Sequence, residues 1–237
     1  MNNNRLLIIV AILFVMPKEV SAQWKIGLTA GATYNHYSMD THYMSDLHIN
    51  DEWGFTYLSN NKGLYLGSFG ILLQYDFNDW FGLRVDLNKT QKNYSYYRTT
   101  VSEKIYYFNN YLQVPMMAVF KFGGNSSFRG FVNIGAFGAY WMERNESGKY
   151  DFLLFSLTAT TDKREYDNER DNRWEYGLNC GMGLEWHFSL FEKKWIWQIL
   201  EARMYYSTSS TQKDYMRIKD PRYNTTLSLQ SGLIYCF

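Results

Sequence analysis

The stretch that decides the fold is RWEYGLNCGMGLEWHF, residues Arg173–Phe188. For sixteen residues it alternates between an apolar set and a set of charged, amide and glycine residues. Successive side chains of a β-strand point to opposite faces, so a period of two indicates a strand with one apolar face. Strands in globular proteins usually have about five or six residues. This segment is therefore a strand of unusual length.

The same alternation recurs along the chain and predicts eight strands, at 23–37, 63–77, 80–97, 104–122, 128–142, 173–188, 194–207 and 223–237. The connections after the second, fourth and sixth strands are short. Those near 38–62, 143–172 and 208–222 are long and polar. An even number of strands, with short turns at one end and long loops at the other, is typical of outer-membrane barrels. We therefore predict an all-β fold, a closed eight-stranded antiparallel up-and-down transmembrane barrel.

Alternation alone leaves open which face of the barrel points outward. A soluble lipocalin-like barrel has its apolar residues inside, whereas an outer-membrane barrel turns them to lipid. The second arrangement is favoured by Gly177, Gly181 and Gly183, which lie on the polar face and would make room in a narrow interior. It is also favoured by aromatic residues near strand ends, where membrane girdles lie: Trp24, Tyr34, Trp174, Trp186 and Tyr206. Pro115 has no N–H for the ladder, so we expect a bulge there.

Composition and the N-terminal segment agree with this prediction. Aromatic residues make up 19% of the chain and include 21 tyrosines, which favours a boundary between apolar and wet phases. Residues 1–22 have the features of a signal peptide, with Arg5 before the apolar run Leu6–Met16 and a small-residue exit at Ala22. Removing them leaves 22 basic and 22 acidic residues, so the mature domain, 23–237, has no basic surplus for nucleic acid.

The chain ends on the strand QSGLIYCF, residues Gln230–Phe237, with an aromatic residue as the last. This ending resembles the assembly signal of bacterial outer-membrane barrels, on Gln230, Gly232, Tyr235 and Phe237. The resemblance implies that the barrel-insertion machinery binds the last strand during assembly. It also implies an outer-membrane location with both termini in the periplasm.

Three internal stretches carry a closer resemblance. NNYLQVPMMAVFKFGG (Asn109–Gly124) resembles the YLEIPLLLKY strand of the PorT-like outer-membrane barrel family of Bacteroidota. GLNCGMGLEWHF (Gly177–Phe188) and EARMYYS (Glu201–Ser207) resemble the glycine-rich strand and the Glu-x-Arg-Tyr strand that follow in that family. Met204 departs from the pattern, since it separates Arg203 from Tyr205. The resemblance implies a barrel and no particular activity.

Polar residues of both charges share the inner face of the predicted strands. A narrow lumen requires buried charges to be paired, so we interpret these residues as a salt-bridge network that fills the barrel, with a proton or ion path as the alternative. The predicted interior residues are Arg84, Asp86, Gln113, Lys121, Asn133, Glu175, Glu185, Glu201 and Arg203.

Other candidate sites are weaker. Cys180 and Cys236 fall on opposite faces of strands that are not neighbours, so we expect no disulfide between them. A group in the first long loop contains metal-ligating residue types, but its spacing matches no closed site: His42, Asp46, His48, Asp51 and Glu52. His36-Tyr37-Ser38 resembles the His-x-Ser of lipid A deacylases, without an acidic partner. We predict no catalytic site, metal or cofactor.

The sequence thus predicts a non-enzymatic integral outer-membrane barrel surrounded by lipid. Its extracellular loops would bind a protein or a surface glycan, or protect the surface. Asp151–Thr161, DFLLFSLTATT, is apolar enough to extend a hairpin beyond the membrane or to meet a partner. The alternatives are an accessory component of a protein-secretion machine and a lipid A-modifying enzyme.

Overall fold

The computed structural model describes residues 23–39, 57–58, 66–98, 103–124, 126–152, 155–161, 171–211, 213 and 222–237. The expected signal peptide lies outside these residues. No helix within them is long and apolar enough to cross a membrane. The strands are β1 (Gln23–Met39), β2 (Tyr57–Leu58), β3 (Leu66–Asp76), β4 (Phe81–Gln91), β5 (Tyr94–Arg98), β6 (Glu103–Phe122), β7 (Phe128–Phe152), β8 (Phe155–Thr161), β9 (Trp174–Leu190), β10 (Lys193–Ser207) and β11 (Arg222–Cys236).

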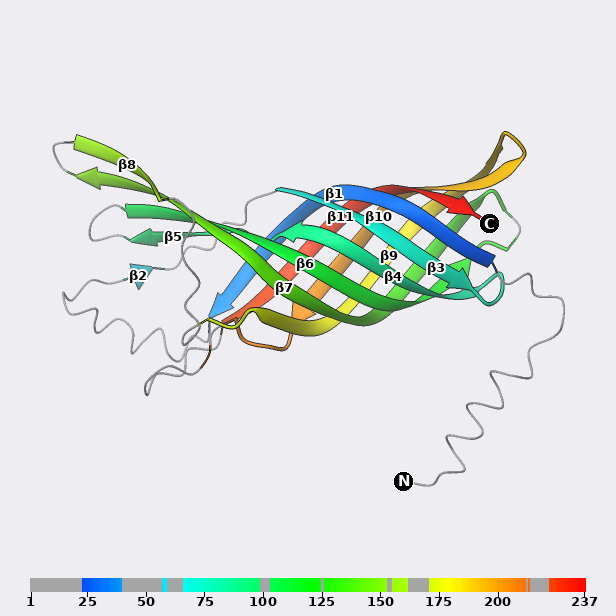
Figure 1. The fold of residues 1–237 in the computed structure, drawn as a ribbon, viewed down its shortest axis with the longest axis horizontal. Coiled ribbons are helices and arrows are strands. Elements are labelled where there is room, and N and C mark those ends of the chain that lie inside the picture. Colours follow the sequence, from blue (N-terminus) through cyan, green and yellow to red (C-terminus); the bar gives the residue numbers. More distant parts are fainter. Residues whose placement is uncertain are drawn as a thin grey trace, which may run out of the picture.

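Eight of these strands close into a barrel, in the order β1-β3-β4-β6-β7-β9-β10-β11 (Figure 1). The first and last strands pair antiparallel from Lys25↔Cys236 to Met39↔Arg222, and the pairing of β6 with β7 completes the ring. Neighbouring strands are antiparallel throughout. The predicted closed eight-stranded antiparallel barrel is confirmed.

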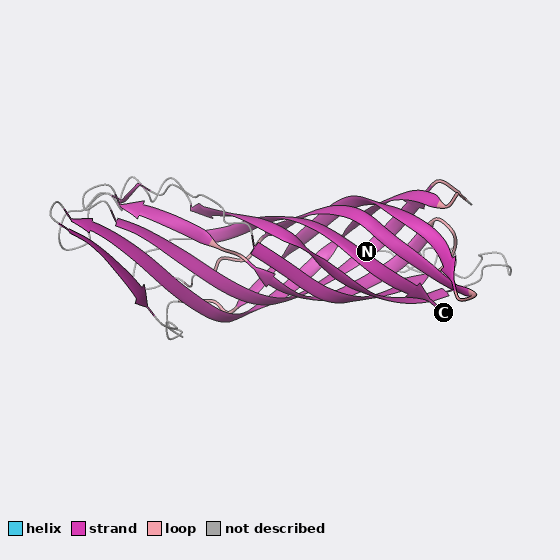
Figure 2. Cartoon of the chain, turned by 90° about the horizontal axis from the view of Figure 1, so that it is seen from above, coloured by secondary structure: helices cyan, strands magenta, loops and turns pink. Residues whose placement is uncertain are grey.

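The remaining strands extend the wall beyond the barrel at one end. β5 pairs with β6, β8 pairs with β7, and the short β2 pairs with β5, so β2-β5-β6-β7-β8 continue as an open sheet. Figure 2 shows these strands projecting from the end opposite the C-terminus. The expected strand at 128–142 is therefore longer than predicted, because β7 reaches Phe152 and returns as β8.

The predicted strand 80–97 is interrupted at Lys92 and Asn93, where both side chains turn inward and alternation fails. Asn93 Oδ1 accepts from the backbone N–H of Asn109 at 2.8 Å, and Asn109 Nδ2 donates to the carbonyl of Lys92 at 3.0 Å. Side-chain amides thus replace ladder bonds at the break. They let the strand change partner, since β4 pairs with β3 and β6, whereas β5 pairs with β6 and β2.

The outward face of the barrel is apolar and the inward face is mostly polar. Leu83, Val85 and Leu87 are exposed outward, whereas Arg84 and Asp86 between them are buried. The open question of which face points outward is thereby settled in favour of a lipid-facing barrel, because a soluble barrel would bury the leucines.

Aromatic side chains form two belts around this apolar face. Ring pairs at the turn end include Trp24–Tyr75 at 4.8 Å and Trp195–Tyr235 at 5.1 Å between centroids. At the loop end, Trp174 contacts Tyr140 at 5.0 Å. From Tyr176 to Trp186, β9 advances about 33 Å along the strand, or about 25 Å along a barrel axis at the usual tilt. The belts are therefore spaced as the two interfaces of an outer membrane require.

The glycines of β9 make room inside the barrel, as their positions predicted. A Cβ at Gly183 would lie 2.5 Å from Phe131 Cζ, and a Cβ at Gly177 would lie 2.7 Å from Phe137 Cε1. Each phenylalanine is the β7 register partner of the glycine that it covers.

The bulge predicted at Pro115 is absent. The β6–β7 register shift falls between Asn110 and Tyr111, and Pro115 pairs directly with Phe137. On the other side of β6, the pairing with β4 is interrupted after Met116↔Val85, where Pro115 has no N–H to donate. The pairing resumes in the same register at Gln113↔Asn88. The proline therefore costs ladder bonds without inserting a residue.

Candidate functional site: the polar interior and the strand ends

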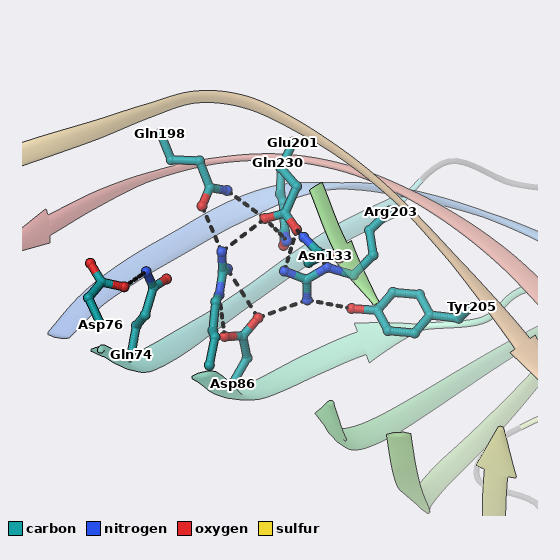
Figure 3. A network of polar contacts seen from close by, with 10 residues as sticks. Gln74, Asp76, Asp86, Asn133, Gln198, Glu201, Arg203, Tyr205 and Gln230 are labelled. Carbon is teal, nitrogen blue, oxygen red and sulfur yellow. Dashed lines mark hydrogen bonds and ion pairs between the residues drawn. The ribbon is translucent and has the colours of Figure 1, made fainter. Parts of the chain in front are cut away.

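The nine predicted interior residues are all buried, with exposures of 5% or less. They project from β4, β6, β7, β9 and β10. The structure gathers five of them into one network at mid-barrel, Arg84, Asp86, Asn133, Glu201 and Arg203 (Figure 3).

Two arginines and two carboxylates of the network form a closed ring of ion pairs. Arg84 Nε lies 2.7 Å from Asp86 Oδ1, and Asp86 Oδ2 lies 2.8 Å from Arg203 Nη1. Arg203 Nη2 lies 2.5 Å from Glu201 Oε1, and Glu201 Oε2 lies 3.2 Å from Arg84 Nη1. Positive and negative groups alternate around the ring, so each buried charge has two opposite neighbours.

Amide and hydroxyl groups make further hydrogen bonds to this ring. Glu201 accepts hydrogen bonds from Gln198 Nε2 at 2.8 Å, Gln230 Nε2 at 3.0 Å and Asn133 Nδ2 at 2.7 Å. Arg203 Nη1 donates to the Tyr205 hydroxyl at 2.9 Å. The network thus joins β4, β7, β10 and β11 across the lumen, where a buried charge requires such partners.

Sequence reasoning missed Gln198, because a bulge in β10 changes which residues face inward. The register of β10 against β9 and β11 shifts after Gln198. Ile196 and Gln198 are buried before the shift, and Glu201 and Arg203 are buried after it. The signal in the sequence is the pair Trp195 and Trp197, which would face inward if strict alternation were extended from Glu201.

A second polar cluster lies where β4 is interrupted. Lys92 Nζ lies 2.5 Å from Glu175 Oε1, and Asn224 Nδ2 donates to Glu175 Oε2 at 2.9 Å. The same ammonium lies 4.9 Å from the ring centroid of Tyr111 and 5.1 Å from that of Phe137. The lysine is thus held by one carboxylate and two aromatic faces.

A third cluster lies at the turn end. Lys25 Nζ lies 2.6 Å from Asp76 Oδ2, and Lys121 Nζ contacts the same oxygen. Nearby, His187 Nε2 lies 2.7 Å from Glu185 Oε1. Together with the first two clusters, these contacts give every buried lysine and arginine in the described residues a carboxylate partner.

The interior is not polar throughout, which the sequence analysis did not anticipate. Leu72, Ile196, Ile234 and Cys236 form an apolar cluster near the turn end. Tyr111, Phe137, Ala139, Trp141 and Tyr205 form another toward the loop end. Gln113 is buried but is not brought into a network, since neither of its amide atoms has a partner within the described residues.

Comparison with known proteins decides the family. Residues 17–212 match the family described as outer membrane protein beta-barrel domain. The chain belongs to this outer-membrane barrel family. No curated protein matches the sequence.

Solved structures with the same fold include other outer-membrane proteins. Neisserial surface protein A is 13% identical, with 90% of this chain and 97% of that chain covered and a TM-score of 0.41. OprG of Pseudomonas aeruginosa is 12% identical, with 92% and 97% covered and a TM-score of 0.46. Ail of Yersinia pestis, solved with the heparin analogue sucrose octasulfate, is 14% identical, with 91% and 99% covered and a TM-score of 0.38.

The last strand of this outer-membrane barrel is paired to its end. The backbone N–H of Phe237 donates to the Trp24 carbonyl at 3.0 Å, and Gln23 Nε2 donates to the Phe237 carbonyl at 3.1 Å. The Phe237 ring points outward with 69% exposure and contacts Tyr235, 5.0 Å away between centroids. Gln230 is buried and bonds Glu201. That these residues form an assembly signal stays a prediction.

The other candidates are placed as follows. Cys180 is exposed on β9 and Cys236 is buried on β11, with β10 between them, and both are free. His36 is exposed on the outward face. The possible metal ligands lie outside the described residues: His42, Asp46, His48, Asp51 and Glu52.

Proposed function

We propose that this protein is a non-enzymatic outer-membrane barrel that presents a binding surface outside the cell, with its termini in the periplasm. The observation that carries the proposal is the open sheet β2-β5-β6-β7-β8, which projects beyond the barrel at the end opposite the C-terminus (Figure 1). A protein or surface glycan is its proposed partner. We also assign the chain to the PorT-like branch, on the motifs at 109–124, 177–188 and 201–207.

The edge of this sheet supports a binding role. Within the described residues, β8 pairs with β7 alone, so its other side presents unpaired backbone groups. Its sequence, FSLTATT, has no charge and no proline. Natural edge strands usually carry charged residues or proline, which prevent pairing with other chains. An edge without them is suited to accept an added strand from a partner.

The interior supports a structural rather than a transport role. The ring of Arg84, Asp86, Glu201 and Arg203 spans the lumen, and an apolar cluster with Ile196 and Ile234 adjoins it toward the turn end. Eight strands enclose only enough space for side chains. The charges are therefore best interpreted as the packing of the barrel.

A trimmed hairpin tests the binding role. The variant joins Ser147 to Thr160, which are register partners, through an Asn-Gly turn and removes the rest of the β7–β8 hairpin. We expect the trimmed barrel to fold, with unchanged heat-dependent migration in gels. Arrays of glycans and of extended peptides, probed with both proteins, should show ligands that bind the full chain and not the trimmed one. The proposal is overturned if the full chain binds no probe or if both proteins bind the same probes equally.

Cysteine labelling tests the orientation separately. In a background without Cys180 and Cys236, Phe191→Cys marks the exposed β9–β10 turn and Gly148→Cys marks the projecting hairpin. A membrane-impermeant maleimide should label intact cells at residue 148 and not at residue 191. The opposite labelling would place the termini outside the cell.

A further inference from the structure

An apolar groove of about 590 Å³ lies on the outer wall of the barrel and crosses the neighbouring strands β9, β10, β11 and β1. It includes Leu28, Ala30, Trp186, Trp197, Ser231 and Leu233. Three strand pairings adjoin it, including the seam between the first and last strands. The groove faces outward and lies next to the aromatic belt of the turn end, on the side of that belt toward the middle of the membrane.

Small residues between large ones create the groove. Ala30 pairs with Ser231 across the β1–β11 seam, and the next outward pair, Leu28 and Leu233, is large. On the β10 side, Trp197 pairs with both Leu233 and Trp186, and the two indole rings lie 6.1 Å apart. The small side chains thus form the bottom of the groove, and the leucine and tryptophan side chains form its sides.

Two polar side chains at the groove, Trp197 and Ser231, are already bonded within the protein. Trp197 Nε1 donates to Ser231 Oγ at 3.2 Å, and Ser231 Oγ donates to the Gln198 carbonyl at 2.9 Å. A ligand in the groove therefore finds hydrocarbon surface and no free donor at these two side chains. Such a surface suits an alkyl chain and not a polar headgroup.

A cation lies on the same outward face, farther toward the strand ends. Lys193 Nζ lies 5.5 Å from the ring centroid of Tyr235. Tyr235 follows Leu233 on the outward face of β11, two residues or about 7 Å closer to the turn end. The ammonium is therefore displaced from the groove in the direction in which the headgroup of an embedded lipid lies.

We propose that this groove binds one acyl chain of a phospholipid, with its phosphate on Lys193. The lipid would belong to the leaflet at the turn end, which is the periplasmic leaflet if the orientation proposed above is correct. The groove and the cation do not depend on that orientation, nor on the projecting hairpin. The inference can therefore fail or hold independently of the proposed binding role.

Photolabelling in nanodiscs tests the site on the full mature chain. The probes are phosphatidylglycerol with a diazirine in the middle of one acyl chain, and diacylglycerol with the same tagged chain. Mass spectrometry of the digested protein maps the adducts. We expect phosphatidylglycerol adducts to concentrate at least fivefold on residues 28–30 and 231–233, relative to outward-facing segments of β4 and β6.

Matched variants separate the groove from general lipid contact. Ala30→Leu fills the groove and should remove most of the concentrated labelling, whereas Ala136→Leu on the outward face of β7 should leave it unchanged. Lys193→Gln should reduce labelling by phosphatidylglycerol and not by diacylglycerol. Lys89→Gln removes an outward-facing cation near the loop end of β4 and should change labelling by neither probe. Gel migration checks that each variant is folded.

Two results would overturn the inference. Labelling spread evenly around the barrel, or unchanged by Ala30→Leu, would show that the groove is ordinary lipid-facing surface. Equal labelling by the two probes, with no effect of Lys193→Gln, would show that the phosphate is not recognised.

Discussion

Replacing Glu201 by glutamine should destabilise the barrel more than any other single change of charge in its interior. Glu201 is fully buried and pairs with both arginines of the ring. It also accepts from three amides, Gln198, Gln230 and Asn133. In Glu201→Gln, Asp86 alone remains to balance two guanidinium groups, and the new amide N–H group faces side chains that are themselves donors.

The expected cost follows from this imbalance. Removing one partner of a buried ion pair costs about 3–5 kcal/mol, because the other charge stays buried without compensation. Both arginines here have exposures of 2% or less, so water cannot screen them. Replacing Arg84 as well leaves a single pair, Arg203 with Asp86. The double variant Arg84→Gln/Glu201→Gln should therefore recover about 1–3 kcal/mol relative to Glu201→Gln alone.

Urea unfolding in detergent micelles, followed by tryptophan fluorescence, measures these differences. Glu192→Gln is the matched control, because Glu192 lies exposed in the β9–β10 turn and its change should stay within about 0.5 kcal/mol. A cost below about 1 kcal/mol for Glu201→Gln would refute the reasoning. So would a double variant no more stable than the single one, since the arginine charge would then not be the source of the loss.

Four further predictions concern packing, the turn, the lumen and assembly. Gly183→Ala should cost about 1–3 kcal/mol, because the added Cβ would lie 2.5 Å from Phe131 Cζ, while Gly67→Ala, with nothing within 4 Å, should cost nothing. Phe191→Asn/Glu192→Gly should stabilise the barrel by about 1 kcal/mol in the same urea assay, because both residues have positive φ, 52° and 62°. Purified protein in planar bilayers should show no discrete conductance steps, and reproducible steps would contradict a filled lumen. Phe237→Ser should reduce outer-membrane yield in cells while refolding in detergent still succeeds, and normal yield in cells would remove the case for an assembly signal.

The strands could be predicted because alternation is a local property. Each of the eight expected segments overlaps one barrel strand, and Arg84, Asp86 and Glu175 face inward as their positions require. The lateral order of the strands follows from short connections and closure. Alternation did not identify the lipid-facing side. The glycines on the polar face and the aromatic residues near the strand ends indicated it.

What the sequence could not show depends on contacts between strands. The bulge in β10 shifts the inward set by one residue, so Gln198 joins Glu201 inside, and the pairing with β9 and β11 locates this shift. Lys92 pairs with Glu175, 83 residues away in the sequence, and no local pattern shows that contact. Leu72 and Ile234 are apolar residues in a mostly polar interior, and they are buried there because they pack in one apolar cluster.

Some residues of the predicted assembly signal also stabilise the folded barrel, so a role in assembly is hard to test separately at those positions. Gln230 donates to Glu201, and a Cβ at Gly232 would lie 2.8 Å from the Leu28 carbonyl oxygen. Changes at these positions would disturb the barrel whether or not the insertion machinery recognises them.

Phe237 is the position where the two roles separate. Its side chain is 69% exposed, and its backbone N–H and carbonyl bond the Trp24 carbonyl and the Gln23 side-chain amide at the start of β1. Phe237→Ser keeps both bonds and removes only the ring, whose burial contributes at most about 2–3 kcal/mol. Deleting the residue removes the bonds as well. Normal yield in cells for Phe237→Ser, with loss of yield for the deletion, would assign the effect to strand pairing and not to recognition of the aromatic side chain.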